Sequence, residues 1–383
     1  MQSGGAIPAE LARKYPNTPD AVLRSLMVVD EQLINYDLIE DLIYYIRSTS
    51  PQTGAILIFL PGLMEITTLY ERLVGDKEEG GFGDVNEYLV FPLHSQLSTS
   101  EQRGIFEPPR EGVRKIVIST NIAETSITIE DCVFVIDAGR VKENRYDNVN
   151  KMATLQEVWV SQASAKQRRG RAGRVRDGYC YHLFSSGTHD DELDEYTLPE
   201  MLRVPLDETI LQIKLLNLCE GRADTFLGNA VNPPPAAAIT NAMESLRDLQ
   251  ALDSAHNDVL TTLGYHLATL PVEPRIGKML CFGAIFNCLD PVLTIAASMS
   301  ARNPFMAPLD KRELADEAKR KLAPETMSDH MTLLAAYQGW EDAHRDASRS
   351  PWKFVHDNFL SNNSLTMIRD LRVQVRERMD MNE

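Results

Sequence analysis

The side chains with the clearest capacity for chemistry lie between Gln167 and Arg174, where the sequence reads QRRGRAGR. Positions three, four and seven residues apart share one face of a helix, so the pattern predicts that Gln167, Arg171 and Arg174 project together. Planar guanidinium groups pair with phosphate oxygens, and a neutral amide can orient an attacking water. A helix face that carries one amide and two guanidinium groups therefore suits a polyphosphate.

The same segment has a less specific interpretation, because a run of basic residues often forms a solvated helix face or a nuclear-import patch. Gly170 and Gly173 weigh against it. A glycine costs about 1 kcal/mol in a helix interior, and a merely solvated face gains nothing in return. Close approach of another backbone or of a ligand would explain both glycines, so we favour the phosphate interpretation.

The elements that must position this segment are predicted from the alternation of short apolar runs with helical stretches in the first half of the chain. Such alternation is typical of helices that cover a parallel sheet. The predicted strands are residues 55–60, 88–91, 115–118 and 132–136, and a helix is predicted from Leu63 to Val74 after the first strand. These elements predict an α/β domain with a mostly parallel sheet.

Further along the chain, residues 140–160 read as two extended arms around Asp147 and predict a hairpin. After Thr188 the pattern becomes helical. Residues 260–272 are predicted as a short strand and a turn, and helices are predicted almost continuously from Ile276 onward. Two apolar stripes at helical spacing support this prediction: Ile239, Met243, Leu246 and Leu249 in one, and Leu365, Ile368, Leu371 and Val375 in the other.

Composition limits the classes of function. The chain has 39 basic and 55 acidic residues, a net charge of −16, which argues against a general electrostatic grip on nucleic acid and requires any such contact to be local. The longest apolar run, residues 55–64, falls short of the roughly 18 residues that a membrane helix needs, so we expect no membrane partner. Five scattered cysteines and eight histidines form no metal-ligand spacing, so we expect no metal site. Residues 1–5 have neither a basic lead nor an apolar run, as a secretory signal would, so we expect an intracellular protein, cytoplasmic or nuclear.

Taken in order, these features resemble the C-terminal half of the helicase core of DEAH-box RNA helicases, in the RNA-helicase-A branch. The strand that leads into Ser119–Ser126 resembles motif V, and Gln167–Arg174 resembles motif VI. The resemblance extends from about Asp37 to Trp340. Its other segments are Ile58–Gly62 for motif IV, Leu93–Leu97 with Gln102 for motif IVa, and Leu263–Leu267, Leu289–Pro291 and Asn303–Phe305 for the domains that follow.

The resemblance implies a domain order. Residues 37–185 would form the second RecA-like domain, residues 186–270 a winged-helix domain and residues 271–383 an incomplete, all-α ratchet-like domain, after a lead-in of residues 1–36. It also implies an ATP-dependent RNA helicase as the parent protein. Because the branch includes members that resolve G-quadruplexes, the implied partner is RNA, with structured or quadruplex nucleic acid among the candidates.

For the nucleotide site, the resemblance implies that Gln167 positions water while Arg171 and Arg174 act as arginine fingers toward the γ-phosphate of ATP. Phe106 resembles the aromatic residue that stacks on adenine. Glu130 stands where many members carry the Asp that contacts the ribose. A lone Phe is as often a core residue, so the core alternative stays open for Phe106.

For nucleic acid, the resemblance implies that Ser119, Thr120, Asn121 and Thr125 belong to a loop that touches the RNA backbone and senses the nucleotide. A short polar loop after a buried strand is suited to phosphate contact. The alternative is that Thr120 and Asn121 only cap a turn. The hairpin of residues 140–160 resembles the one that pries strands apart in this family.

Two parts of a complete ATPase are absent from the sequence. No G-x-x-x-x-G-K-[ST] phosphate loop occurs, because Gly277 and Lys278 are followed by Met279. The acids of Asp316–Lys319 lie in a charged helical stretch, where no buried strand could present them to Mg²⁺. We therefore expect a first RecA-like domain of the same parent chain to hold most of the ATP with its Mg²⁺, and the isolated chain to be inactive.

A second class of function is a non-catalytic RNA-binding or protein-docking module. The predicted winged-helix and helical parts could hold RNA or a protein without hydrolysing anything. The net charge of −16 makes tight RNA binding by this chain alone a weak expectation. The two hypotheses differ in one respect: the docking module needs nothing from Arg171 and Arg174, while the motor needs both.

Overall fold

The computed structural model describes residues 7–49, 54–75, 81–94, 104–147, 152–174, 176–306, 311–346 and 348–380. The described residues divide into two compact units. The first ends at Thr197 and includes residues 104–143 and 156–197, and the second holds residues 144–155 and everything from Leu198 onward. Each unit has hydrophobic clusters of its own.

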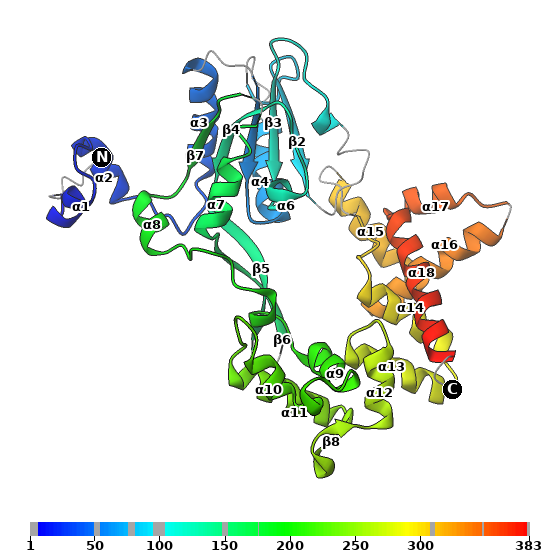
Figure 1. Cartoon of the computed structure of the whole chain (residues 1–383). Coiled ribbons are helices and arrows are strands. Elements are labelled where there is room, and N and C mark those ends of the chain that lie inside the picture. Colours follow the sequence, from blue (N-terminus) through cyan, green and yellow to red (C-terminus); the bar gives the residue numbers. More distant parts are fainter. Residues whose placement is uncertain are drawn as a thin grey trace. The chain divides into compact units, whose positions relative to one another are not determined.

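The first unit is built on a parallel sheet of five strands in the order β2-β3-β1-β4-β7 (Figure 1). The strands are β1 (Ala55–Phe59), β2 (Tyr88–Leu93), β3 (Arg114–Ser119), β4 (Cys132–Asp137) and β7 (Tyr179–His182). Every residue of β1 and β4 is buried, as expected of central strands covered on both faces. The prediction of an α/β domain with a parallel sheet is confirmed, and β7 is an additional edge strand.

Helices cover both faces of this sheet. On one face, α3 (Tyr36–Thr49) and α4 (Leu63–Gly75) bury apolar residues against Ile56, Ile58 and Ile116 of the strands. The other face carries α6 (Ile122–Thr125) and α7 (Gln162–Arg169), together with a helical turn at residues 104–106. Alternation along each strand sends successive side chains into these two separate clusters.

The remaining elements of the first unit lie at its ends. Short helices α1 (Ala9–Lys14) and α2 (Asp20–Leu26) precede the sheet, and α8 (Ser186–Asp191) follows it. The hydroxyl of Tyr15 accepts a hydrogen bond from the backbone N–H of Gly187 at 3.0 Å, so the lead-in contacts α8. The predicted hairpin is confirmed as a two-stranded sheet of β5 (Arg140–Asp147) and β6 (Met152–Trp159), of which residues 144–155 belong to the second unit. Its connecting residues 148–151 lie outside the described residues.

The second unit is helical apart from short β pairs. From Leu198 to Thr269 a hydrophobic cluster joins its helices with a small antiparallel pair. The elements are η1 (Glu200–Leu202), α9 (Asp207–Leu215), η2 (Leu218–Gly221), α10 (Ala223–Gly228), α11 (Ala236–Asp248), β8 (Leu252–Asp253), η3 (Ser254–His256), β9 (Val259–Leu260) and α12 (Thr262–Thr269). The winged-helix assignment of this region stays a prediction.

One prediction for this region was wrong. Residues 260–272 do not form a strand and a turn, because the strand ends at Leu260 and α12 occupies Thr262–Thr269. The hydroxyl of Thr261 accepts the backbone N–H of Gly264 and so caps the helix. Gly264 is required by packing, since a Cβ there would lie 2.0 Å from the carbonyl oxygen of Ala251.

The rest of the second unit is all helical in its described residues, except for one isolated bridge between Phe305 and Leu360. Its helices are α13 (Pro274–Ile285), α14 (Leu289–Ser300), α15 (Arg312–Leu322), α16 (Asp329–Arg345), α17 (Pro351–Asp357) and α18 (Asn362–Asp380). The predicted stripe on α18 is confirmed, because Leu365, Ile368 and Val375 are buried. The acids of Asp316–Lys319 lie on helix α15, as the sequence predicted.

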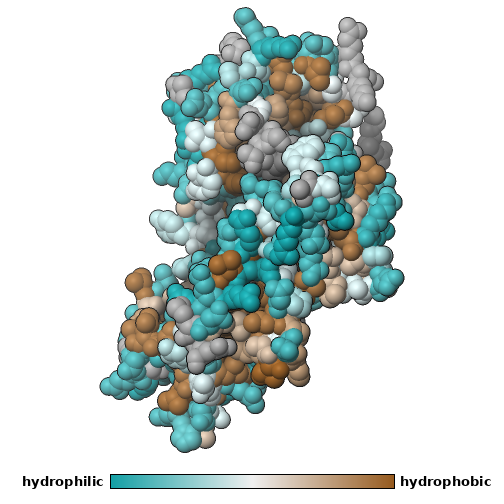
Figure 2. Space-filling model, turned by 90° about the vertical axis from the view of Figure 1, so that its right-hand side faces the viewer, coloured by the Kyte–Doolittle hydropathy of each residue, from teal (hydrophilic) through white to brown (hydrophobic). Residues whose placement is uncertain are grey.

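No helix in the described part of the chain is both long and apolar enough to cross a membrane. The face drawn in Figure 2 is largely hydrophilic, with separate apolar patches between polar ones.

Candidate functional site

The candidate site lies where the central strands of the first unit end. Because β1, β3, β4 and β7 are parallel, their carboxyl ends meet at one edge of the sheet, which is where α/β proteins bind ligands. Phe59, Ser119, Asp137 and His182 are the last residues of these strands. Helix α6 begins beyond Ser119, and α7 contacts both α6 and β4.

Arg168 is the centre of a buried ionic cluster at this edge. Its side chain is 0% exposed, and Nη1 donates to Oδ1 of Asp137 at 2.8 Å while Nε donates to Oε2 of Glu124 at 3.1 Å. The guanidinium carbon also lies 4.9 Å from the centroid of the Phe59 ring. One arginine therefore ties α7 to the ends of β1 and β4 and to α6.

The protonation of this cluster follows from its geometry. Burial alone would raise the pKa of Asp137, but the charge of Arg168 and hydrogen bonds from Arg168, His182 and the N–H of Gly139 outweigh burial and lower it. Burial likewise opposes the charge on Arg168, and its two carboxylate partners raise the pKa above the usual arginine value. Both groups are therefore ionised, and each depends on the other.

Helix α7 ends earlier than the sequence predicted. Its N-cap Ser161 accepts the N–H of Ser164 at 3.1 Å, and its last residue is Arg169. Beyond it, the N–H of Arg171 bonds to the carbonyl of Arg168 at 3.0 Å, so the backbone continues as tight turns. The prediction of one continuous helix face through Arg174 was therefore wrong, since Gln167 lies on α7 whereas Arg171 and Arg174 lie in the turns.

The turns still bring Arg171 and Arg174 to one place. The guanidinium of Arg171 donates to the carbonyl oxygens of Glu124 and Ile127, and Nη1 of Arg174 donates to Oγ1 of Thr128 at 2.8 Å. Both cations thus contact the end of α6 and the residues that follow it. Gln167 is exposed on the last turn of α7, and no side-chain hydrogen bond joins it to either arginine within the described residues.

The guanidinium groups of Arg171 and Arg174 form no ion pair with a carboxylate of the described residues. No carboxylate oxygen of the described residues lies within 4.0 Å of either, whereas nearby Arg168 contacts two carboxylates and one backbone carbonyl. Burial and the adjacent charge of Arg174 lower the pKa of Arg171. The charge of Glu124 acts in the opposite direction on Arg171, but no described carboxylate forms an ion pair with either arginine. The two guanidinium groups can therefore bind an anion, and their planar forks match phosphate oxygens.

The glycines of this segment have a different explanation from the one predicted. Gly170 is the C-cap of α7 and Gly173 lies in the turns, so neither occupies a helix interior. A Cβ at Gly170 would meet the carbonyl oxygen of Gln167 at 3.3 Å, and a Cβ at Gly173 would meet no described atom within 4 Å. The prediction that a close neighbour requires these glycines therefore has slight support at Gly170, and among the described residues it has none at Gly173.

The loop after β3 is part buried and part exposed. Ser119 is fully buried, and its hydroxyl donates to the carbonyl of Thr120 at 2.9 Å. Thr120 is also buried, whereas Asn121 and Thr125 are exposed. The capping alternative holds for Thr120, whose hydroxyl accepts the N–H of Ile122 at 3.5 Å, but not for Asn121, which occupies the N-cap position of α6 without a side-chain capping bond. The exposed Asn121 and Thr125 are the side chains that a ligand can reach.

The two predicted nucleoside contacts lie on turns of the same unit. Phe106 is 55% exposed, so the core alternative for this residue was wrong. Glu130 is exposed on the turn before β4. Of the motif IVa residues, Leu93 and His94 are described, while Ser95, Gln96, Leu97 and Gln102 lie outside the described residues.

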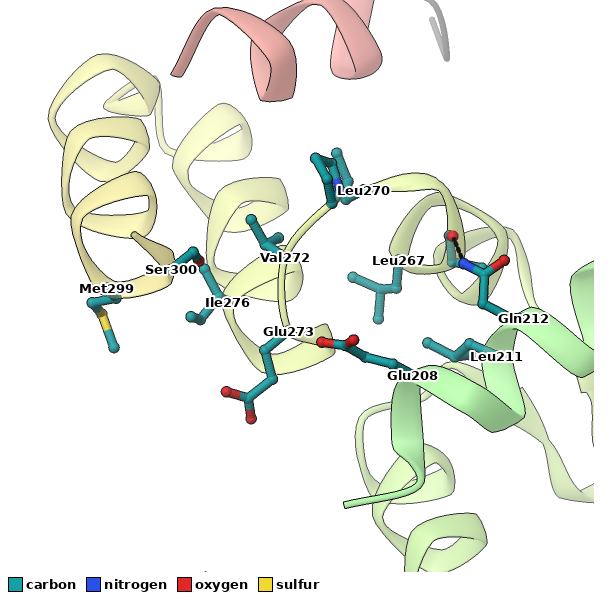
Figure 3. A pocket seen from close by; sticks show the side chains of 12 residues that line it. Glu208, Leu211, Gln212, Leu267, Leu270, Val272, Glu273, Ile276, Met299 and Ser300 are labelled. Carbon is teal, nitrogen blue, oxygen red and sulfur yellow. Dashed lines mark hydrogen bonds between the residues drawn. The ribbon is translucent and has the colours of Figure 1, made fainter. Parts of the chain in front are cut away.

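A separate cavity lies in the second unit. It has a volume of about 420 Å³ and is lined by α9, the end of α12 and the ends of α13 and α14 (Figure 3). Apolar side chains such as Leu211, Leu267 and Val272 form its lining together with the carboxylates of Glu208 and Glu273. Burial, then the charges of Glu273 and Asp207, raise the pKa of Glu208. None of the predicted site residues lines this cavity, so we assign it no part in nucleotide chemistry.

Residues 36–176 match the family model described as helicase conserved C-terminal domain, and residues 273–333 match helicase associated domain (HA2), ratchet-like. The chain is 47% identical over 370 residues to the ATP-dependent DNA/RNA helicase DHX36 of Mus musculus, covering 97% of this chain and 36% of that protein. It is 43% identical over 371 residues to the putative ATP-dependent RNA helicase DHX57 of Homo sapiens, covering 96% and 26%. It is 46% identical over 360 residues to the DExH-box ATP-dependent RNA helicase DExH1 of Arabidopsis thaliana, covering 94% and 35%.

The parallel sheet, the arginine segment at its carboxyl edge and these matches define the class: a RecA-like helicase domain followed by a helical, ratchet-like domain. Within that class, the chain belongs to the DEAH-box/RNA-helicase-A family and carries the C-terminal half of its helicase core. It spans about a quarter to a third of the length of the relatives named above.

Two residues of the site were missed by sequence reasoning. Arg168 was treated as one of several basic residues, although it is the buried one that anchors α7. Lys115 was predicted only as part of a strand, although its ammonium group contacts the turn that carries Phe106. The burial of Arg168 could have been suspected from Asp137, because an acid at the end of a buried strand needs a cationic partner.

Proposed function

We propose that this chain is the second motor lobe of an ATP-dependent nucleic-acid helicase. The observation that carries the proposal is the pair Arg171 and Arg174, held together on one segment without a carboxylate partner among the described residues. A polyphosphate would supply the missing negative charge. Because transferring phosphoryl groups carry charge on their outer oxygens, two fixed guanidinium groups stabilise the transition state more than the ground state.

In this proposal ATP lies between two RecA-like lobes, and a first lobe of the same polypeptide supplies the phosphate loop. Arg171 and Arg174 reach across to the γ-phosphate as arginine fingers. The exposed amide of Gln167, on the last turn of α7, orients the attacking water. Mg²⁺, held mainly by the first lobe, would neutralise phosphate charge. This chain alone would then hydrolyse no ATP.

The proposed nucleic-acid contact is the loop after β3. Thr125 lies within the Glu124–Thr128 segment that holds the arginines, Asn121 lies three residues before that segment, and both side chains are exposed. If this segment moves when ATP is hydrolysed, the contacts of Asn121 and Thr125 with the RNA backbone would therefore change. The buried Ser119 and Thr120 would act by fixing the loop, and the β5–β6 hairpin would separate strands. RNA, including structured RNA, is the proposed substrate, which agrees with the names of the relatives.

The alternative of a non-catalytic docking module needs no free pair of arginines at the sheet edge. A docking module would give Arg171 and Arg174 no function, although the electrostatic repulsion between their two like charges is unfavourable. We therefore prefer the motor.

The test of the proposal is ATP turnover by the complete helicase, measured with and without single-stranded RNA, together with displacement of a paired strand. We expect turnover that RNA stimulates and displacement that requires ATP. RNA binding with no ATP turnover under either condition would favour the docking module and overturn the proposal.

A further inference from the structure

Lys115 is a buried lysine that contacts two turns of the first unit. Its side chain is 1% exposed, and Nζ donates to the carbonyl oxygens of Ile105 at 2.7 Å and Glu107 at 3.1 Å. The same Nζ lies 2.7 Å from Oδ1 of Asp131. The three ammonium protons of Lys115 therefore have three acceptors within hydrogen-bond distance.

The three acceptors of Lys115 are sequence neighbours of the two predicted nucleoside contacts, Phe106 and Glu130. Ile105 and Glu107 are the residues on either side of Phe106, and Asp131 follows Glu130. Lys115 thus links the turn that presents Phe106 to the turn that presents Glu130. Lys115 belongs to β3, an interior strand that lies between β2 and β1, so both turns are attached to the same strand of the sheet.

The Phe106 turn is fixed from below as well. Ile105 is buried in the hydrophobic cluster on this face of the sheet, and a Cβ at Gly104 would lie 2.8 Å from the ring of Phe91. The backbone on both sides of Phe106 is therefore held, while the Phe106 ring itself stays more than half exposed. An exposed ring on a fixed backbone is suited to stack on a planar base, since little ordering is needed on binding.

We propose that Lys115 is a positioning residue for the nucleoside: it sets the spacing between Phe106 and Glu130, so that one bound ligand can meet both the ring and the carboxylate. The inference rests on the proposed function and deepens it. The ligand class is a purine nucleotide recognised through its base and ribose. The phosphates lie with Arg171 and Arg174, so Lys115 should affect recognition of the nucleoside and leave recognition of the phosphates unchanged.

The experiment compares two ligands of the complete helicase: ATP, through its KM, and inorganic tripolyphosphate, through its inhibition constant as a competitor. Tripolyphosphate has the phosphates but neither base nor ribose. For Lys115→Met we expect the KM for ATP to rise about tenfold, because a misplaced Phe106 loses its stacking on the base. The inhibition constant of tripolyphosphate should stay unchanged. Phe106→Ala should give the same pattern. Lys278→Met is the matched control, because the part-buried Lys278 also donates to a backbone carbonyl, that of Leu249, but lies in the second unit.

A purely structural role predicts something else. Lys115→Met leaves the carboxylate of Asp131 without its cation, and that defect alone could disturb the fold. The double variant Lys115→Met/Asp131→Asn removes the stranded charge but does not restore the contacts to Ile105 and Glu107. If the double variant still shows a raised KM for ATP alone, the positioning role is supported. If it regains the normal KM, or if ATP and tripolyphosphate weaken together, Lys115 only balances a charge or maintains the fold and the inference is overturned.

The proposed function and this inference fail separately. An unchanged KM in Lys115→Met, beside a raised KM in Phe106→Ala, would refute the role of Lys115 and leave the motor intact. Normal turnover after replacement of Arg171 and Arg174 would refute the motor whatever Lys115 does.

Discussion

Nη1 of Arg168 lies 2.8 Å from Oδ1 of Asp137, and both side chains are fully buried. This pair joins the end of β4 to α7, only three residues before Arg171 in the sequence. The exposed arginines of the site therefore depend on a buried one. Stability and function are coupled at this point, because loosening the pair would release the turns that carry Arg171 and Arg174.

The first prediction concerns this pair. Asp137→Asn leaves the charge of Arg168 buried beside one carboxylate instead of two, so we expect the free energy of unfolding to fall by about 3–5 kcal/mol. Chemical denaturation followed by circular dichroism measures the loss. Arg169→Gln is the control, since Arg169 is exposed on the same helix and should change stability by less than about 0.5 kcal/mol. Equal effects of the two variants would contradict the central place of the Arg168–Asp137 pair.

The second prediction is a pH dependence. The pKa of Asp137 is lowered in the folded chain from its ordinary 3.8, so the unfolded chain binds the proton first as the pH falls. The stability that Asp137 contributes is complete above that ordinary value and is lost as the pH drops below it. Unfolding experiments between neutral pH and about pH 3 should show a steeper acid loss for the native chain than for Asp137→Asn. Parallel curves for the two proteins would show that another group causes the acid loss.

The third prediction concerns the chain by itself. It contains no phosphate loop, since Lys278 is followed by Met279, and its acid-rich tetrad lies on the helix α15. We expect the purified 383-residue chain to release no phosphate from ATP above background, with or without RNA. Phosphate release that RNA stimulates, and that survives Arg174→Ala, would show that the chain hydrolyses ATP by a route we have not described.

Much of the fold was predictable, for a physical reason. Parallel strands that are covered on both faces must be apolar throughout, so β1 and β4 stand out in the sequence as continuous apolar runs. Edge strand β7 was missed because its residues, Tyr179–His182, are only partly buried and read as polar. Helix α12 was missed because Gly264 and Pro271 suggested a turn. In the structure Gly264 lies within the helix, where the backbone of Ala251 leaves no room for a side chain.

The candidate site was predictable in its residues but not in its geometry. Gln167, Arg171 and Arg174 were identified from spacing, and the arginines do share one place, yet through turns rather than along a helix. Which arginine of the run is buried could not be inferred from local sequence. That choice depends on Asp137 and Glu124, which lie 31 and 44 residues away from Arg168 in the chain.

The most direct measurement of the central claim is the turnover of the complete helicase with Arg171 or Arg174 replaced. We predict that Arg171→Ala and Arg174→Ala each lower RNA-stimulated ATP turnover by roughly 10³- to 10⁵-fold, the range typical of arginine fingers, with the melting temperature preserved. Arg169→Ala, on the same segment but outside the pair, should retain near-normal turnover. A loss of less than tenfold in both Arg171→Ala and Arg174→Ala would contradict the account.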